Sequence, residues 1–188
     1  AIVKTAKEHE KSNIKLTFII CFRKLYFNKF YEKGDIQVGM YKFLSAACGD
    51  MTRWVKLENC ETGKVEVCFD DSYLRHEYQK GFELMQIGGI YNCKILLFGI
   101  AIDLSDEDAI KQSRIICETT DRELFVCETI DNNFSIGNRN FLQTISNGNI
   151  YYIAISDAEA LNDISRFVFR CSRKDLIQVD DIIHPRYL

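Results

Sequence analysis

Two segments of the chain repeat one pattern, and this repeat constrains the fold more than any other feature of the sequence. Residues 105–117, SDEDAIKQSRIIC, and residues 156–171, SDAEALNDISRFVFRC, both begin with Ser-Asp. Each continues through acidic residues to Ser-Arg, an apolar run and a cysteine. A pattern that recurs within one chain indicates a duplicated structural unit.

Three further matches occur in the same order along the chain. They pair 60–72 with 117–133, 82–91 with 141–151, and 100–110 with 153–161. The offsets between matched residues scatter between 51 and 60, so the repeat predicts a period near 55 residues with insertions in loops. The alternative is chance similarity between β-rich stretches of one protein.

Alternating apolar and polar residues predict that most elements are strands. The clearest prediction is a hairpin of 53–60 and 65–71, because Gly63 in the turn ETGK takes a positive φ at low cost. Serine followed three residues later by an acid predicts short helices beginning at Ser105, Ser156 and Ser172. Further strands are expected at 14–22, 40–48, 88–102, 113–117, 123–129, 149–156 and 165–171, a long loop at 131–149, and a terminal helix at 174–183.

The expected fold class is mainly β with short helices (α+β), with two tandem small SH3-like or OB-like β-barrel units. The predicted organisation is an N-terminal basic arm with covering strands (1–48), a first β-rich unit (49–112), and a second β-rich unit with a C-terminal helix (113–188). A unit near 55 residues is marginally stable alone, so the two units are expected to pack together.

Eight cysteines are spread along the chain, and no two lie closer than eight residues. Most lie in apolar, strand-like runs, where a reduced thiol behaves as a small hydrophobic group. This favours free buried thiols in a cytoplasmic protein over four disulfides in a secreted one. The segment LTFIICF (16–22) is too short to span a membrane, and the Ile-, Lys- and Asn-rich composition suits a low-GC bacterium or its phage.

No motif for catalysis, metal binding or phosphate binding is present in the sequence. The three histidines are far apart, and CxxC, G-x-x-x-x-G-K-[ST] and G-x-S-x-G are all missing. An enzyme would need a nucleophile such as Cys68 or Cys127 with a base such as His76. A binding site for a hard cation would need several carboxylates close together in the fold. The candidate acids also suit the end of a strand or the start of a helix, and they are Asp70, Asp71, Asp103, Asp106, Glu107 and Asp108.

Charge is distributed unevenly along the chain. Residues 1–33 hold eight Lys/Arg against three Glu, a net charge of +5, and residues 34–188 hold 16 Lys/Arg against 24 acids, a net charge of −8. The basic arm either docks on the acidic body or binds a polyanion. Within the arm, cations alternate with aromatic rings as on surfaces that bind single-stranded nucleic acid, at Arg23, Lys24, Tyr26, Lys29, Phe30 and Tyr31.

The sequence therefore predicts a non-enzymatic binding protein that uses no cofactor or metal. The acidic body favours recognition of a basic protein surface, as an inhibitor or immunity-type protein would require. The expected partner-binding residues are acids and aromatic residues in loops: Asp70, Asp71, Tyr73, Tyr78, Asp131 and Phe134. The alternative is a single-stranded nucleic-acid binder that uses residues 22–33.

Overall fold

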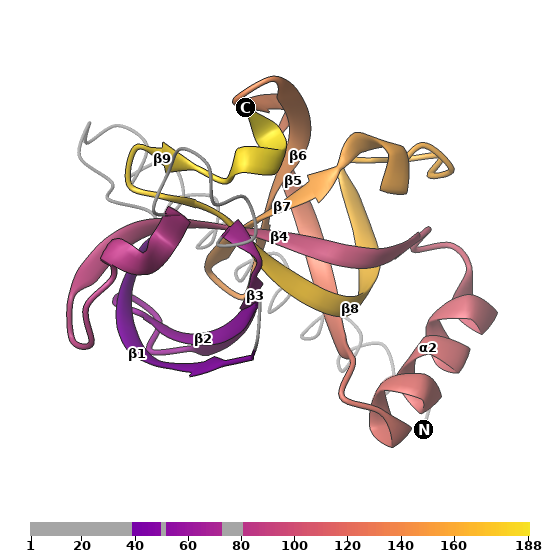
Figure 1. Cartoon of the computed structure of the whole chain (residues 1–188). Coiled ribbons are helices and arrows are strands. Elements are labelled where there is room, and N and C mark those ends of the chain that lie inside the picture. The colour runs from indigo at the N-terminus through magenta and orange to yellow at the C-terminus, as the bar shows by residue number, and fades with distance from the viewer. Residues whose placement is uncertain (1–38, 50–51, 73–80) are drawn as a thin grey trace, which may run out of the picture. The chain divides into compact units, whose positions relative to one another are not determined.

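The computed structural model describes residues 39–49, 52–72 and 81–188, which are mostly β (Figure 1). Nine strands in these residues form one sheet in the order β3-β2-β1-β4-β7-β6-β5-β8-β9. They are β1 (Met40–Cys48), β2 (Arg53–Asn59), β3 (Val65–Asp70), β4 (Ile90–Ile102), β5 (Glu123–Ile136), β6 (Arg139–Ser146), β7 (Asn149–Ala154), β8 (Arg166–Val179) and β9 (Ile182–Ile183). The helices within the described ranges are α2 (Glu107–Thr119) and the short 3-10 turns η2 (Gly81–Leu84), η3 (Ile155–Asp157) and η4 (Pro185–Tyr187).

Five strands close into a first ring. β1, β2 and β3 are successive antiparallel neighbours, and β4 pairs antiparallel with β1. β8 then pairs antiparallel with β4, and it meets β3 in parallel at Phe69 and Asp175. Every strand of this ring therefore has a neighbour on both sides, which protects strand edges from pairing with other chains.

The second ring repeats the pairing scheme of the first. β5, β6 and β7 are successive antiparallel neighbours, β8 pairs antiparallel with β5, and β4 pairs in parallel with β7. In each ring a three-strand meander is closed by the same two long strands. One long strand lies antiparallel to the first strand of the meander, and the other lies parallel to the third.

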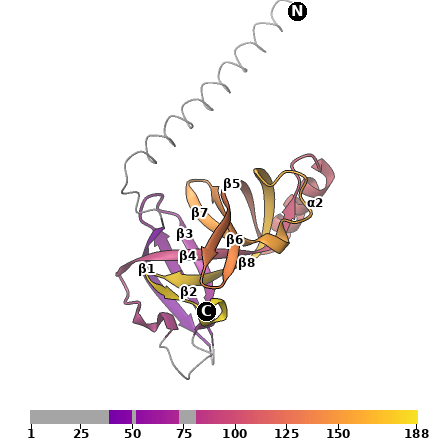
Figure 2. The same ribbon diagram turned by 90° about the horizontal axis from the view of Figure 1, so that it is seen from above.

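β4 and β8 belong to both rings, and the views show them running from one set of strands to the other (Figures 1 and 2). They stay paired from Cys93 with Val179 to Ile102 with Val168, and the register shifts at Phe98/Gly99. A Cβ atom on Gly99 would overlap the backbone oxygen of Arg170. The absence of a side chain therefore allows the two backbones to approach where they pass between the rings.

One hydrophobic core extends through both rings. Its fully buried side chains include Tyr41 and Leu57 of the first meander and Phe125 and Tyr151 of the second. Leu97 of β4 and Phe169 of β8 belong to the same cluster. A smaller cluster holds the C-terminal segment against the outside of the sheet, with Leu96, Ile136, Phe141, Tyr152, Ile177 and Tyr187.

The predicted hairpin at 53–71 is confirmed, with Gly63 at a φ of 69° and Asn59 Oδ1 accepting from the backbone of Glu61 and Thr62. The predicted loop at 131–149 is wrong, because β5, β6 and β7 form two tight hairpins there. Asn147 and Gly148 have φ values of 50° and 79°, which match the twist of a two-residue hairpin turn.

The strand predicted at 113–117 is wrong, because these residues belong to helix α2. Asp106, not the predicted Ser105, caps this helix by accepting from the amide of Ala109. Ser113 is buried and Ile110 and Ile116 are half-buried, so the helical period fits the apolar residues of this segment. The predicted boundary between 112 and 113 falls within this helix.

The terminal helix predicted at 174–183 is also wrong, because residues 174–179 complete strand β8. β8 is buried on both sides here, so its apolar run lacks the alternation of a half-exposed strand. The two Ser-Asp segments thus differ in structure, since the first forms α2 and the second forms η3 and β8. The strands expected at 40–48, 88–102, 123–129, 149–156 and 165–171 are confirmed, and the one at 14–22 lies outside the described residues.

We expect Gly99→Ala to lower the free energy of unfolding by about 2–3 kcal/mol, the cost of overpacking a close backbone contact. Gly49→Ala is the matched control, because the nearest atom to a Cβ there lies at an ordinary contact distance of 3.5 Å. Urea denaturation followed by circular dichroism measures both variants. Equal stability of the two variants would contradict the close approach of β4 and β8.

Candidate partner-binding surfaces

A group of charges around the buried Glu66 lies where the two rings meet, and we name this place the junction. Glu66 of β3 is fully buried, and its carboxylate accepts hydrogen bonds from three groups. These are Lys174 Nζ at 2.5 Å, the Tyr151 hydroxyl at 2.5 Å and Lys64 Nζ at 2.7 Å. Lys174 also pairs with Glu123, so two lysines balance two carboxylates.

These residues tie both meanders to a shared strand. Glu66 belongs to the first meander, Tyr151 and Glu123 to the second, and Lys174 to β8. Burial raises the pKa of Glu66, but the hydrogen bonds from Lys174, Lys64 and Tyr151 outweigh it and hold the pKa below the usual 4.5. Glu66 is therefore ionised at neutral pH and anchors the junction.

A second charged group holds the C-terminal segment against the end of β3. Asp70 is 1% exposed and accepts from Arg53 Nε at 2.6 Å. Asp71 binds His184 Nε2 at 2.8 Å and also pairs with Arg186. Both acids were predicted to contact a partner, but the structure shows them bound to residues of their own chain.

The protonation of His184 follows from these contacts. Burial lowers the pKa of His184 although Asp71 lies beside it, so the imidazole is neutral at pH 7. Its Nδ1 accepts from the backbone N–H of Arg186 at 3.1 Å, so the proton is on Nε2 and is donated to Asp71. This histidine fixes the turn before the C-terminus.

The other predicted partner-binding residues have different environments. Phe134 is half-buried against Tyr152, with ring centroids 5.2 Å apart. Asp131 is exposed, and its carboxylate accepts from the backbone N–H of Asn133. The rest lie outside the described residues: Tyr73, Tyr78, and the alternative nucleic-acid set Arg23, Lys24, Tyr26, Lys29, Phe30 and Tyr31.

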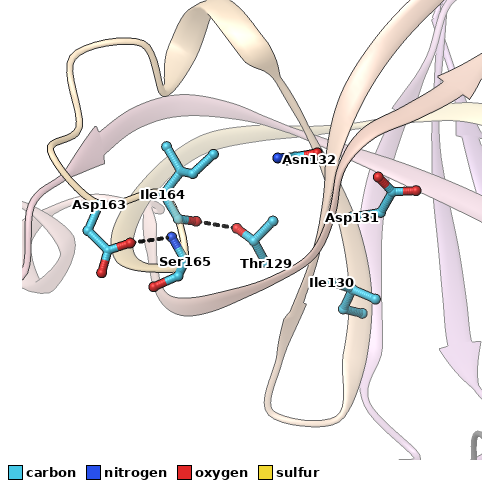
Figure 3. Close-up of a pocket in the computed structure, with 7 residues that line it drawn as sticks. All are labelled: Thr129, Ile130, Asp131, Asn132, Asp163, Ile164 and Ser165. Carbon is cyan, nitrogen blue, oxygen red and sulfur yellow. Dashed lines mark hydrogen bonds between the residues drawn. The ribbon is translucent and has the colours of Figure 1, made fainter.

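Asp131 lines a surface hollow of about 380 Å³ together with Asp163 (Figure 3). Thr129 and Ile164 lie between the two aspartates, where the Thr129 hydroxyl donates to the carbonyl of Ile164. The backbone N–H of Thr129 also donates to the carbonyl of Ser165 at 2.9 Å. The hollow is therefore held open by hydrogen bonds between β5 and the segment that precedes β8.

Further acids continue from this hollow to the start of helix α2. Asp103 accepts from the backbone of Asn162 at 3.3 Å, next to Asp163. Hydrogen bonds from Ser105 lower the pKa of Asp103, and those from Ser165 lower the pKa of Asp163, so both are charged at neutral pH. We name this set the acidic surface: Asp103, Asp106, Glu107, Asp108, Asp131 and Asp163.

The acidic surface reflects a wider separation of charge. Residues 103–172 carry twelve Asp/Glu against six Lys/Arg, a net charge of −6. Of these acids only Glu123 and Glu128 form ion pairs within the described part of the chain. The sequence pattern indicates several of these acids but not Asp163, because only the folded chain places Asp163 beside Asp103 and Asp131.

The cysteines serve mainly as core residues. Seven lie in the described ranges as free thiols, and four of them are buried: Cys68, Cys93, Cys127 and Cys171. Burial raises the pKa of Cys93, Cys127 and Cys171 to about 12, so their thiols are protonated at neutral pH.

Within residues 39–49, 52–72 and 81–188, no three His, Cys, Asp or Glu side chains are grouped as metal ligands. None of the helices described there has the length and apolar character to cross a membrane. Comparisons with protein-family models, curated proteins and solved structures find no match.

We expect Lys174→Met to lower the free energy of unfolding by about 3–5 kcal/mol, because it leaves Glu66 buried without its closest cation. Lys94→Met is the control, since Lys94 is half-buried, forms no ion pair with the described residues and has its pKa lowered by burial. Adding Glu66→Gln to Lys174→Met should restore part of the loss. Chemical denaturation measures the free energy of unfolding of all three variants. If Lys174→Met lost no more stability than Lys94→Met, the ion pair with Glu66 would not stabilise the junction.

The junction should also make stability depend on pH. The folded pKa of Glu66 is lower than its unfolded value near 4.5, so its contribution is present above pH 4.5 and is lost as the pH falls through the folded pKa. The difference in unfolding free energy between wild type and Glu66→Gln should therefore narrow on acidification. Urea titrations at several pH values between neutrality and strong acid test this. A constant difference would show that Glu66 is not stabilised in its ionised form.

Proposed function

We propose that this chain is a non-enzymatic protein-binding module whose acidic surface recognises a basic segment of another protein. The observation that carries the proposal is the gathering of carboxylates around the hollow between Asp131 and Asp163, none of which forms an ion pair with another described residue. These acids are exposed or half-buried, and they come from three segments separated in sequence. An inhibitor or immunity-type role fits this mode of recognition.

Electrostatics favour a partner rich in lysine and arginine. Exposed acids of one sign accelerate encounter with a basic surface and reject acidic competitors. The hollow adds a concave contact in which a cationic side chain can lie between two carboxylates. Thr129 and Ile164, which also line the hollow, offer apolar atoms that match the methylene stem of such a side chain.

The two rings support a related proposal about the origin of the fold. We infer that each ring is a small barrel of SH3-like or OB-like type, and that β1–β4 and β5–β8 are copies of one unit. Support comes from the identical pairing scheme of the two rings. β4 is antiparallel to the first strand of the first meander and parallel to the third strand of the second, and β8 pairs with the two meanders in the opposite way. This division of the chain into two copies differs from the sequence repeat of about 55 residues, because it treats β4 and β8 as equivalent strands.

We also propose that the protein works in a reducing compartment such as the cytoplasm. The free thiols, four of them in the core, support this location.

A synthetic peptide rich in Lys and Arg provides a direct test of the acidic surface. Wild type should bind it with strong salt dependence. The double variant Asp131→Asn/Asp163→Asn should bind about three- to tenfold more weakly, as expected for the loss of two exposed ion pairs. Fluorescence anisotropy of the labelled peptide measures the affinity.

The matched control removes two acids elsewhere, with Glu83→Gln/Asp181→Asn, since both residues are exposed and lie outside residues 103–172. This control has the same net charge as the test variant, so it separates a local site from a general charge effect. Equal weakening in both variants, or no binding by wild type at low salt, would refute the proposal.

A further inference from the structure

Strand β3 presents its apolar side to solvent and its polar side to the core. Val65 and Val67 are 47% and 42% exposed, whereas Glu66, Cys68 and Asp70 are buried. A strand that faces solvent ordinarily shows the reverse, since burying a carboxylate is costly and burying a valine is favourable. The internal ion pairs of Glu66 and Asp70 make this orientation stable, and they leave apolar side chains on the surface.

The neighbouring strands extend this surface into a three-strand face. Trp54 of β2 lies between Ala47 of β1 and Phe69 of β3, and Lys56 lies between Ser45 and Val67 in the next row. Trp54 is 44% exposed. We name this the outer face of the first ring: Ser45, Ala47, Trp54, Lys56, Val65, Val67 and Phe69.

An ordered row of rings crosses one end of the outer face. Trp54 and Phe69 are in edge contact, with centroids 5.2 Å apart. The Arg173 guanidinium lies 4.6 Å from the centre of Phe69 and 5.0 Å from that of Phe98.

Asp175 fixes this guanidinium with two bonds of 2.6 and 2.8 Å. The flat groups of the row are therefore held in place before any ligand arrives, which lowers the entropy cost of binding.

The charge of the outer face is opposite to that of the acidic surface. Lys42 and Lys56 are exposed and form no ion pair with the described residues. Glu58 is the one acid that points outward among the described residues of β1, β2 and β3, and it lies directly across from Lys42, so Lys56 is the cation with no acid opposite it. Helix α2 and its acids lie at the other end of the two-ring unit (Figures 1 and 2). A basic protein segment would be repelled here, whereas an anionic ligand with flat apolar groups is complementary.

We propose that the outer face binds single-stranded nucleic acid. Bases stack on exposed aromatic rings whatever their sequence, and lysines hold the phosphates between them. Trp54 supplies the exposed ring, the row through Phe69 and Arg173 continues the platform, and Lys56 and Lys42 lie along its side. This site is separate from the basic segment 22–33 and from the acidic surface, so it goes beyond the protein-binding function.

Trp54 is the only tryptophan of the chain, so its fluorescence reports on this face directly. The full chain is titrated at low salt with a thymidine oligonucleotide of about 12 nucleotides, a length within the range that such sites cover. Stacking should quench the Trp54 emission, and the affinity should fall steeply as salt is added. Oligonucleotide binding measured by anisotropy without any quenching would place the ligand elsewhere and overturn the proposal.

Variants assign the affinity to individual side chains. Trp54→Ala should weaken binding about tenfold, the usual loss for one stacked base, and Trp54→Phe should restore most of it. Lys56→Glu should weaken binding and reduce its salt dependence, whereas Lys111→Glu on α2, an exposed site with the same charge change, should have no effect. Thermal unfolding confirms that each variant is folded.

Two results would refute the assignment. Unchanged affinity in both Trp54→Ala and Lys56→Glu would show that nucleic acid, if bound, contacts other residues. Trp54 emission that changes with protein concentration alone, together with dimers in sedimentation, would show that a second copy of the chain covers the outer face instead.

Discussion

The buried ion pair between Glu66 and Lys174 is the interaction on which the rest of the structure depends. Lys174 lies on β8 where this strand closes the first ring after leaving the second, and Glu66 faces it from the first meander. Two opposite charges in the interior are tolerated only when paired and hydrogen-bonded, and Tyr151 and Lys64 complete that pairing. This requirement fixes how β8 passes between the rings.

The direction in which β3 faces follows from the same pair. With Glu66 inside, its neighbours Val65 and Val67 must face outward, because successive side chains of a strand point to opposite sides. The outer face is therefore a consequence of the junction as well as a candidate binding site. The acidic surface arises separately, from strand β5, helix α2 and the loops between β4 and β8, so the proposed protein-binding and nucleic-acid sites differ in both position and charge.

Local sequence patterns predicted much of the sheet. The hairpin around Gly63 and the strands at 40–48, 88–102 and 149–156 were predicted because alternation and turn residues act over a few neighbours. The dipeptide Asn147-Gly148 is an equally local indication of a hairpin turn, although the polar residues around it suggest a loop. The helix expected from Ser105 is present as α2, but it extends through residues 113–117, because Ile-Ile-Cys suits a strand or a helix and packing against the body decides between them. Of the proposed partner residues, Asp131 is exposed, whereas Asp70 and Asp71 are bound within the chain.

The sequence by itself determined the β-rich class, the positions of most strands and the uneven charge along the chain, since composition, period-two alternation and turn chemistry are local properties. Only the tertiary structure decided which side of β3 is buried and that β4 and β8 serve two rings. It also brought Asp103, Asp131 and Asp163 together. These outcomes depend on contacts between residues far apart in the chain, and the free energy of burying a charge is set by partners that no local pattern identifies.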